Sequence, residues 1–368
     1  MIDNIKKIVL VDESVPINTR NTKILDSLAL SFPNAEIHVI SWDRENKYQE
    51  DSSDKHYHLF KRPAKYGNKV HKLFGLLGYR KFCCAEIKNI NPDIIIASHW
   101  NNLLMLPSLR KNQMLIYENL DAPTGPLLGR KFLNLIEHYY MNKAALTIHA
   151  SRFYTQIYPK KYPQLVLENK PTIQTQSVEY SSQFPLRVVF LGNIRYVSIL
   201  KNLADAVRND NRFQLYYHGY GPDYETLKKY TQSLTNIHCT GEYKYEDIGH
   251  LYGDSDVIWA AYPNKDFNVK YAISNKFHES IAYTIPAVYS DQTMLGDYAD
   301  ANKIGFKVNP YSVESIKELL NGFVSDGNRL SSVHDNLVEF KCHETTWNED
   351  FKKLESAIQH FFETTNKY

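Results

Sequence analysis

The sequence predicts an α/β fold of two Rossmann-like domains facing a cleft, and three observations predict it. The chain has 368 residues, which is too long for one ordinary hydrophobic core. Short apolar runs alternate with helix-compatible stretches, which is typical of a doubly wound parallel sheet. This alternation occurs twice, on either side of a stretch rich in Pro, Ser, Thr and Gln at residues 159–185. The expected parts are an amino-terminal Rossmann-like domain, a linker, a carboxyl-terminal Rossmann-like domain and a closing helix, at residues 1–170, 171–186, 187–343 and 344–368.

The first series of apolar runs predicts five strands in the amino-terminal domain. They cover residues 8–11, 37–41, 93–97, 115–117 and 145–148. Two helices are expected between them, at about residues 21–31 and 129–143. Parallel strands end at one edge of their sheet, so ligands are expected at that edge, where it faces the cleft.

The second series predicts five more strands, and the chain ends in an amphipathic helix. The strands cover residues 187–191, 213–217, 237–239, 257–259 and 287–289. Helices fit at about residues 200–208 and 222–233. The last segment, from Glu344 to Glu363, carries its aromatic and aliphatic residues on one side, as a helix that covers a core does.

The composition is that of an ordinary globular protein and excludes several classes of function. A net charge of +2 does not indicate a nucleic-acid partner, although residues 1–180 carry 24 Lys and Arg against 17 Asp and Glu. The four cysteines show no metal-ligand spacing and no disulfide framework, so a reducing cytoplasm is the expected setting. No apolar run is long enough for a signal peptide or a membrane span.

Residues 274–290 form the stretch with the clearest chemistry. A short helix is expected to begin at about Asn275 and to end before Pro286. Lys276 and Glu279 are three residues apart and share a face at the amino end of this helix. A helix terminus with a lysine suits a diphosphate, and a carboxylate suits a pair of ribose hydroxyls, so the stretch predicts a sugar-nucleotide site. The alternative is a plain surface pair on an exposed helix.

Three other strand ends in the carboxyl-terminal domain carry candidate binding residues. The strand at residues 187–191 is followed by a glycine, which allows close approach of a phosphate, and by an arginine, which can neutralise it. The strand at residues 213–217 is followed by Gly-x-Gly-Pro before a helix. The loop after the strand at residues 237–239 places an aromatic ring where it can stack on a base. Each of the three strand ends also has an explanation without a ligand. The first can be a simple turn, the second a plain connection from strand to helix, and the third a tyrosine with no binding role. The residues are Gly192, Asn193 and Arg195, then Gly219, Tyr220 and Gly221, and then Tyr243.

Polar residues also follow two strands of the amino-terminal domain. His99 follows residues 93–97, where a histidine can bind a sugar hydroxyl or transfer a proton, although most histidines of the chain must be structural or solvated. The carboxylates of Glu118 and Asp121 follow the next strand and either hold an acceptor or cap a loop. No cluster of carboxylates indicates a metal site.

A basic and apolar segment covers residues 61–84. It holds seven Lys and Arg and no acid, interleaved with leucines and aromatic residues. This pattern suits an anionic membrane surface. It equally suits a solvated helix that packs its leucines on the sheet. The basic residues are Lys61, Arg62, Lys65, Lys69, Lys72, Arg80 and Lys81.

Together these motifs resemble the GT-B glycosyltransferases, specifically the group 1 or family-4-like nucleotide-sugar-dependent enzymes of bacterial polysaccharide and glycolipid assembly. The similar segments lie in the family's order, mainly between about residues 90 and 310. They are DIIIASHWNN, EHYYMNKAALTIHAS, VVFLGNIRY, LYYHGYGPDYETLKK with TGEYKYEDIGHLYGDSDVIWAAYP, and SNKFHESIAYTIPAVYSD.

The resemblance implies a role for each candidate residue. Arg195 and Lys276 would hold the donor diphosphate and Glu279 the ribose, while residues 241–243 would hold the base. His99 would contact the sugar and the acceptor from the other domain. Asn275 and the residues at the three strand ends would complete the donor site.

The implied activity is that of a hexosyltransferase that moves a sugar from a nucleotide-sugar to a glycan or lipid-linked acceptor in cell-surface polysaccharide synthesis, such as that of a capsule. The resemblance implies a retaining, metal-independent reaction that needs no cofactor besides the donor. The protein would be cytoplasmic, either free or peripheral on the inner face of the membrane.

The sequence departs from the family pattern at three places. Tyr271 stands where many relatives have a glutamate eight residues before Glu279, residues 14–20 replace a glycine-rich loop, and Lys201 is out of register with a common lysine. Two alternatives therefore stay open. One is a sugar-nucleotide epimerase of the same architecture, and the other is a non-catalytic partner subunit.

Overall fold

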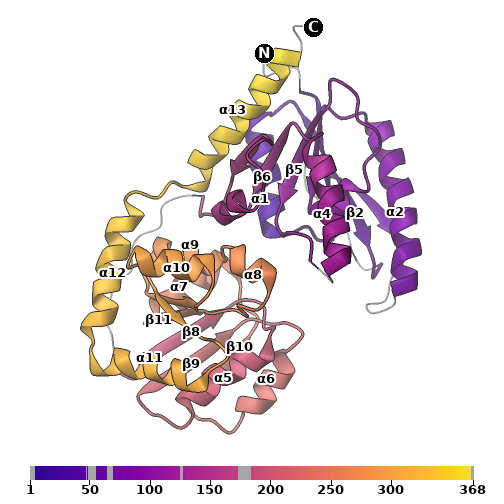
Figure 1. The fold of residues 1–368 in the computed structure, drawn as a ribbon. Helices are drawn as coiled ribbons and strands as arrows, with labels where there is room; N and C mark the ends of the chain where they lie inside the picture. The colour runs from indigo at the N-terminus through magenta and orange to yellow at the C-terminus, as the bar shows by residue number, and fades with distance from the viewer. Residues whose placement is uncertain are drawn as a thin grey trace. The chain divides into compact units, whose positions relative to one another are not determined.

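The computed structural model describes most of the chain as two compact units. The described residues are 5–46, 48, 55–63, 69–124, 127–172 and 184–365, with the side chains of 69–74, 127–128 and 245 excepted. One unit consists of residues 1–168 with 348–368, and the other of residues 169–347. Figure 1 draws both units. Much of the expected linker, residues 173–183, lies outside the described residues.

The first unit contains a parallel sheet of seven strands in the order β3-β2-β1-β4-β5-β6-β7. The strands are β1 (Lys7–Val11), β2 (Glu36–Asp43), β3 (Lys55–Lys61), β4 (Ile94–Ser98), β5 (Met114–Asn119), β6 (Leu146–His149) and β7 (Gln164–Val166). All five strands predicted here are confirmed.

The prediction missed the two edge strands of this sheet. β3 mixes His and Lys with Tyr, Leu and Phe, and most of its residues are only half buried, because it pairs only with β2. β7 has three residues and pairs only with β6. It lies inside the Pro-rich stretch at residues 159–185, so the first part of that stretch belongs to the sheet.

Helices cover the sheet of the first unit (Figure 1). They are α1 (Thr19–Ser31), α2 (Lys69–Ile90), α3 (Trp100–Leu103), α4 (Leu127–Met141), the 3-10 helix η2 (Arg152–Gln156) and α13 (Trp347–Thr365). The side chain of Asn18 caps α1 by accepting from the backbone N–H of Asn21. From residue 348 onward, α13 belongs to the first unit, and it buries Phe351, Leu354 and Ile358. None of the helices in the described ranges is long and apolar enough to cross a membrane.

The second unit contains a parallel sheet of six strands in the order β10-β9-β8-β11-β12-β13. The strands are β8 (Leu186–Leu191), β9 (Phe213–His218), β10 (Ile237–Gly241), β11 (Val257–Ala260), β12 (Ala287–Ser290) and β13 (Phe306–Val308). The five predicted strands are confirmed, and only the three-residue edge strand β13 was missed. The core consists of buried Leu, Ile, Val and aromatic side chains from these strands and from α5, α6 and α11.

Among the described residues of this unit, nine helical segments surround the sheet. They are α5 (Val197–Val207), α6 (Tyr224–Thr231), the 3-10 helix η3 (Tyr245–Asp247), α7 (Ile248–Gly253), α8 (Phe267–Tyr271), α9 (Asn275–Tyr283), α10 (Met294–Ala301), α11 (Val313–Ser325) and α12 (Asn328–Lys341). The predicted helix at residue 275 is confirmed as α9. It ends at Tyr283, and its C-cap Thr284 has a left-handed conformation two residues before Pro286.

A buried carboxyl group ties α4 to the sheet of the first unit. Glu137 is only 1% exposed and accepts hydrogen bonds from the hydroxyls of Tyr117, at 2.6 Å, and Tyr158, at 2.9 Å. Burial raises the pKa of Glu137 to about 7 from its ordinary value of 4.5, although the two tyrosines oppose the shift. The side chain is therefore uncharged in the folded protein at mildly acidic pH.

Replacing Glu137 with Gln is expected to raise the free energy of unfolding above pH 7 by about 2 to 3 kcal/mol. The pKa is higher in the folded state, so this group's contribution to stability is full below pH 4.5 and is lost as the pH rises through 7. A glutamine can still accept from both tyrosines and carries no charge. Denaturant unfolding across this pH range measures the difference, which should shrink toward pH 4.5. A difference that does not change with pH would contradict the assignment.

Candidate functional site

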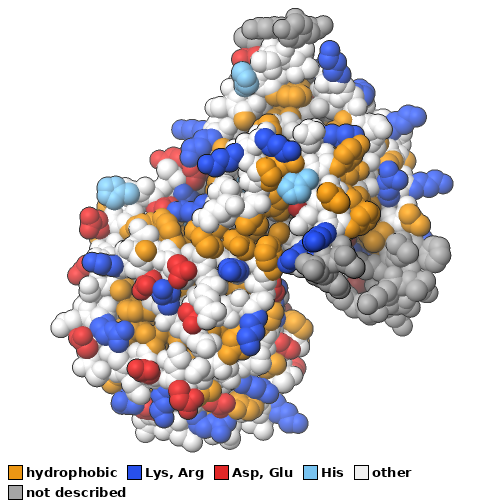
Figure 2. All heavy atoms as spheres, viewed as in Figure 1, with side chains coloured by type: hydrophobic (Ala, Val, Ile, Leu, Met, Phe, Trp, Pro, Cys, Tyr) orange, Lys and Arg blue, Asp and Glu red, His pale blue; other side chains and the backbone are white. Residues whose placement is uncertain are grey.

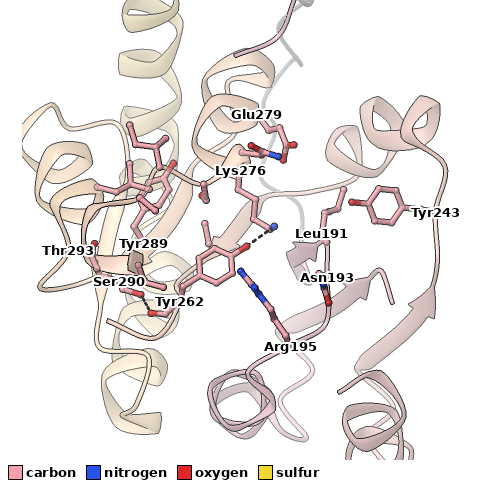
Figure 3. A pocket seen from close by; sticks show the side chains of 18 residues that line it. Leu191, Asn193, Arg195, Tyr243, Tyr262, Lys276, Glu279, Tyr289, Ser290 and Thr293 are labelled. Atoms are coloured by element: carbon pink, nitrogen blue, oxygen red, sulfur yellow. Dashed lines mark hydrogen bonds between the residues drawn. The ribbon is translucent and has the colours of Figure 1, made fainter. Parts of the chain in front are cut away.

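The second unit has a pocket at the carboxyl ends of β8, β11 and β12, which is where a parallel sheet binds ligands. Its volume is about 390 Å³, within the range of small-molecule sites. The lining residues are Leu191, Gly192, Asn193, Arg195, Tyr243, Ala260, Tyr262, Val269, Ala272, Ile273, Ser274, Asn275, Lys276, Glu279, Tyr289, Ser290, Thr293 and Leu295. Seven of these residues were predicted from the sequence, and Figure 3 shows how the labelled ones are arranged.

Lys276 reaches into this pocket from the first turn of α9. Its Nζ donates a hydrogen bond to the hydroxyl of Tyr262 at 2.9 Å, drawn as a dashed line in Figure 3. The same atom lies 4.8 Å from the centre of the Phe190 ring. A Cβ atom at Gly192 would come within 3.0 Å of it, so the glycine leaves room for the ammonium group. Lys276 is 7% exposed, so its interpretation as part of a surface pair on an exposed helix is wrong.

The buried ammonium group keeps its charge. Burial by itself lowers the pKa of Lys276, but its interactions with the Tyr262 hydroxyl and the nearby Glu279 carboxylate outweigh burial and leave this pKa above its usual value. No salt bridge joins Lys276 to Glu279 among the residues that the structure describes. The pocket thus offers a fixed positive charge whose acidic neighbour is not in direct contact with it.

The amino terminus of α9 faces the same pocket through Ser274, Asn275 and Lys276. Ser274 is the N-cap, but its side chain makes no capping hydrogen bond. The hydroxyl oxygens of Ser274 and Tyr289 are both buried without a partner in the described chain. Buried polar atoms normally have partners, so these two predict a polar ligand or water in the pocket. The side chain of Asn275 is exposed and accepts from Asn169 at 3.1 Å.

Glu279 lies one turn further along α9. Its Oε2 accepts a hydrogen bond from the hydroxyl of Tyr252 at 2.5 Å. Tyr252 is fully buried, and burial raises its pKa, so it remains a donor at neutral pH. This bond holds the carboxylate in one orientation at the pocket wall.

Arg195 approaches the pocket from the turn that follows β8. Its side chain is exposed, with the guanidinium carbon 4.9 Å from the centre of the Tyr196 ring. The turn is fixed by two backbone hydrogen bonds, from the N–H of Gly192 to His218 at 2.9 Å and from that of Ile194 to Tyr220 at 3.1 Å. Figure 3 shows Arg195 and Lys276 on the same side of the pocket as Tyr262. The pocket therefore has two cationic side chains beside a helix amino terminus.

The motif Gly219-Tyr220-Gly221 does not line the pocket. Gly219 has φ of 132°, and a Cβ atom there would lie 1.8 Å from the carbonyl oxygen of Gly192. A Cβ atom at Gly221 would lie 2.1 Å from Oδ1 of Asn193. The two glycines thus allow the loop after β9 to pack against the turn after β8. They affect the pocket indirectly, by positioning that turn. Tyr220 is about half exposed, and its ring lies against Tyr224.

Tyr243 lines the far wall of the pocket. In Figure 3 its ring lies beyond Leu191 and Asn193, on the side opposite Tyr289 and Thr293. Of the predicted base-binding residues 241–243, only Tyr243 contributes to the lining.

Sequence reasoning missed several polar residues of the pocket. Tyr262 follows β11, and Ser290 is the last residue of β12. Thr293 lies three residues further on and caps α10, where its side chain accepts a hydrogen bond from the backbone N–H of Gly296. The rule that identified the other strand ends would have identified these too. Tyr252 lies on α7 and acts through Glu279, and the sequence shows no sign of that contact.

His99 belongs to the first unit, not to the unit that holds this pocket. It precedes α3 with φ of 65° and ψ of 151°, a conformation that residues with a side chain rarely adopt. Such strain at the end of a parallel strand is common at functional sites, and the role of His99 stays a prediction. Glu118 is fully buried and forms an ion pair with Arg20 at 2.7 Å, so this carboxylate joins β5 to α1.

The described residues include no group of three or more His, Cys, Asp or Glu side chains that could hold a metal ion. Metal independence stays a prediction, since a metal can also arrive with a substrate.

A comparison with protein-family models identifies one family. The model of the family described as glycosyl transferases group 1 matches residues 152–337, which is just over half of the chain and includes every residue of the pocket. A comparison with curated proteins gives no significant match.

Solved structures show the same fold at low sequence identity. Sucrose-phosphate synthase from Thermosynechococcus elongatus is 12% identical, with a TM-score of 0.75 over 98% of this chain and 100% of that one. The Anabaena protein HepE, in complex with UDP and glucose, is 13% identical, with a TM-score of 0.66 over 96% and 99%. The lipopolysaccharide outer core galactosyltransferase WaaB is 15% identical, with a TM-score of 0.63 over 96% and 99%.

The fold, the two parallel sheets and the family match lead to the same assignment. The chain has the GT-B architecture that the sequence predicts. It belongs to the group 1 glycosyl transferases.

Proposed function

We propose that this glycosyltransferase takes its sugar from a nucleoside diphosphate sugar bound in the pocket at the carboxyl edge of the second sheet. The observation that carries the proposal is the buried, charged Lys276 at the amino terminus of α9, with Arg195 beside it. Two cations and a helix amino terminus suit a diphosphate. The carboxylate of Glu279, one turn away, suits the hydroxyls of the ribose, and Tyr243 suits the base.

The same groups account for catalysis. When the bond between sugar and diphosphate breaks, negative charge builds on the departing diphosphate, and fixed positive groups stabilise that charge most. Lys276 is already oriented by Tyr262, so it needs no rearrangement at that moment. The reaction we propose is retaining and metal-independent. NMR of the product's anomeric proton and transfer assays with a chelator test these two points.

The acceptor we propose is a growing glycan or a lipid-linked sugar in cell-surface polysaccharide synthesis. Support comes from similarity of fold to a lipopolysaccharide galactosyltransferase and from the basic, apolar segment at residues 61–84. Lys61, Arg62, Arg80 and Lys81 are exposed, whereas residues 64–68 and the side chains of 69–74 lie outside the described parts. Contact of this segment with the inner face of an anionic membrane would bring the enzyme to such an acceptor.

Glu279→Gln is expected to weaken nucleoside diphosphate binding by about tenfold to a hundredfold, because a charged acceptor for the ribose is lost. Isothermal titration with a panel of nucleoside diphosphates measures this loss. The matched control is Glu225→Gln, an exposed carboxylate of α6 in the same unit and outside the pocket, which should change nothing.

The titration also tests the proposal as a whole. Unchanged binding by Glu279→Gln would remove this residue from the site. Failure of the wild-type chain to bind any nucleoside diphosphate would contradict the proposed donor and favour a non-catalytic partner subunit. Interconversion of the donor's sugar without an acceptor would favour an epimerase.

A further inference from the structure

Two helices of the first unit expose large apolar side chains. Phe132, Leu135 and Tyr139 of α4 are 63%, 70% and 56% exposed, and Leu77 of α2 is 60% exposed. The three residues of α4 are three and four positions apart, so they form one stripe along the helix. We call these four residues the apolar face. Half of the large hydrophobic residues that are exposed in the described chain belong to it.

A pocket connects the two helices at this face. It has a volume of about 410 Å³ and is lined by Arg80, Leu106, Pro107, Ser108, Leu109, Tyr139, Tyr140 and Lys143. Arg80 lies one turn after Leu77 on α2, and its Nε donates to the backbone oxygen of Leu104 at 2.9 Å. The Nζ of Lys143 lies 4.2 Å from the centre of the Tyr139 ring. The pocket thus places two cations and two tyrosines at one end of the apolar face.

The charges around the face are basic. Arg80, Lys81, Lys131 and Lys143 are exposed. The single acid of α4, Glu137, is buried against the sheet. In Figure 2, hydrophobic and basic side chains lie next to each other over the part of the first unit where Figure 1 draws α4. A ligand that complements these exposed cations is negatively charged. It must also have an apolar part, which removes the exposed leucine and phenylalanine side chains from water.

An anionic lipid bilayer meets both requirements. Leu77, Phe132 and Leu135 can enter the boundary between head groups and acyl chains, which a nucleic acid does not offer. A tyrosine at the edge of such a face is typical of the membrane interface, where its ring is apolar and its hydroxyl is hydrated. Lysine and arginine beside it bind lipid phosphates.

We propose that the apolar face is a membrane-binding surface and that the pocket between α2 and α4 binds the phosphate of an anionic phospholipid through Arg80 and Lys143. This surface rests on the membrane contact proposed above and deepens it, because it adds α4 and a head-group site to the basic segment at residues 61–84. Donor binding by the second unit does not depend on it.

Sedimentation of the full chain with vesicles tests the proposal. The vesicles are phosphatidylcholine alone, or an equal mixture of phosphatidylcholine and phosphatidylglycerol. The wild-type chain should bind only the mixture, and less at high salt. Each cation near an anionic surface accounts for about a fivefold change in partitioning, so Arg80→Gln with Lys143→Gln should weaken binding by about twentyfold or more. Phe132→Ser with Leu135→Ser should weaken it by at least a similar factor.

Matched variants serve as controls. Lys228→Gln with Lys229→Gln removes two exposed cations from α6, and Leu30→Ser removes the exposed leucine of α1. Both should bind the mixed vesicles like the wild type. All variants should keep the wild-type melting temperature and nucleoside diphosphate affinity, which separates this proposal from the donor site. Absence of binding to the mixed vesicles, or equal binding by the face variants and the controls, would overturn it.

Discussion

Lys276→Met is expected to reduce kcat/KM by about a hundredfold to a thousandfold, the usual effect of removing one group that stabilises transition-state charge. Methionine is similar in length and remains compatible with the Phe190 ring and the buried position. The variant therefore removes the charge with little change in packing. The fold should be retained, because methionine fills the same buried space.

Steady-state transfer and nucleoside diphosphate titration measure this effect. The control is Lys270→Met, an exposed lysine of α8 that does not line the pocket. If Lys276 mainly binds the donor in its ground state, KM should rise while kcat changes little. If it mainly stabilises the leaving diphosphate, kcat should fall. Wild-type kinetics for Lys276→Met would remove the central element of the proposed site.

Gly219→Ala is expected to lower the free energy of unfolding by about 3 kcal/mol or more. The added Cβ would lie 1.8 Å from the carbonyl oxygen of Gly192, and the backbone at Gly219 has φ of 132°. The carbonyl oxygen is a backbone atom and the Cβ is fixed directly to the backbone, so no side-chain rotation relieves this contact. Moving Gly192 would displace the turn that carries Arg195, so nucleotide affinity should fall together with stability.

Denaturant unfolding and nucleotide titration of the same preparation test this coupling. Gly253→Ala, at the end of α7, is the matched control, because a Cβ atom there has nothing within 4 Å. It should leave both quantities nearly unchanged. Loss of nucleotide affinity in Gly219→Ala without loss of stability would mean that the glycine contacts the ligand directly, as the motif first suggested.

Much of the fold could be read from the sequence because buried parallel strands are continuous apolar runs. All ten predicted strands are present, and the helix at Asn275 begins where its cap and spacing indicate. The strands that were missed, β3, β7 and β13, lie at sheet edges. An edge strand is buried less and is often short, so it leaves a weak apolar pattern.

The sequence by itself determined the two α/β series, the order of the strand ends and the residue types that follow them. The tertiary structure alone decided that Lys276 is buried against Tyr262, that Gly219 shapes a turn and that α4 exposes an apolar stripe. The physical reason is that strand and helix patterns arise from neighbours along the chain. Burial, hydrogen-bond partners and close backbone approach arise from residues far apart in the sequence, which only folding brings together.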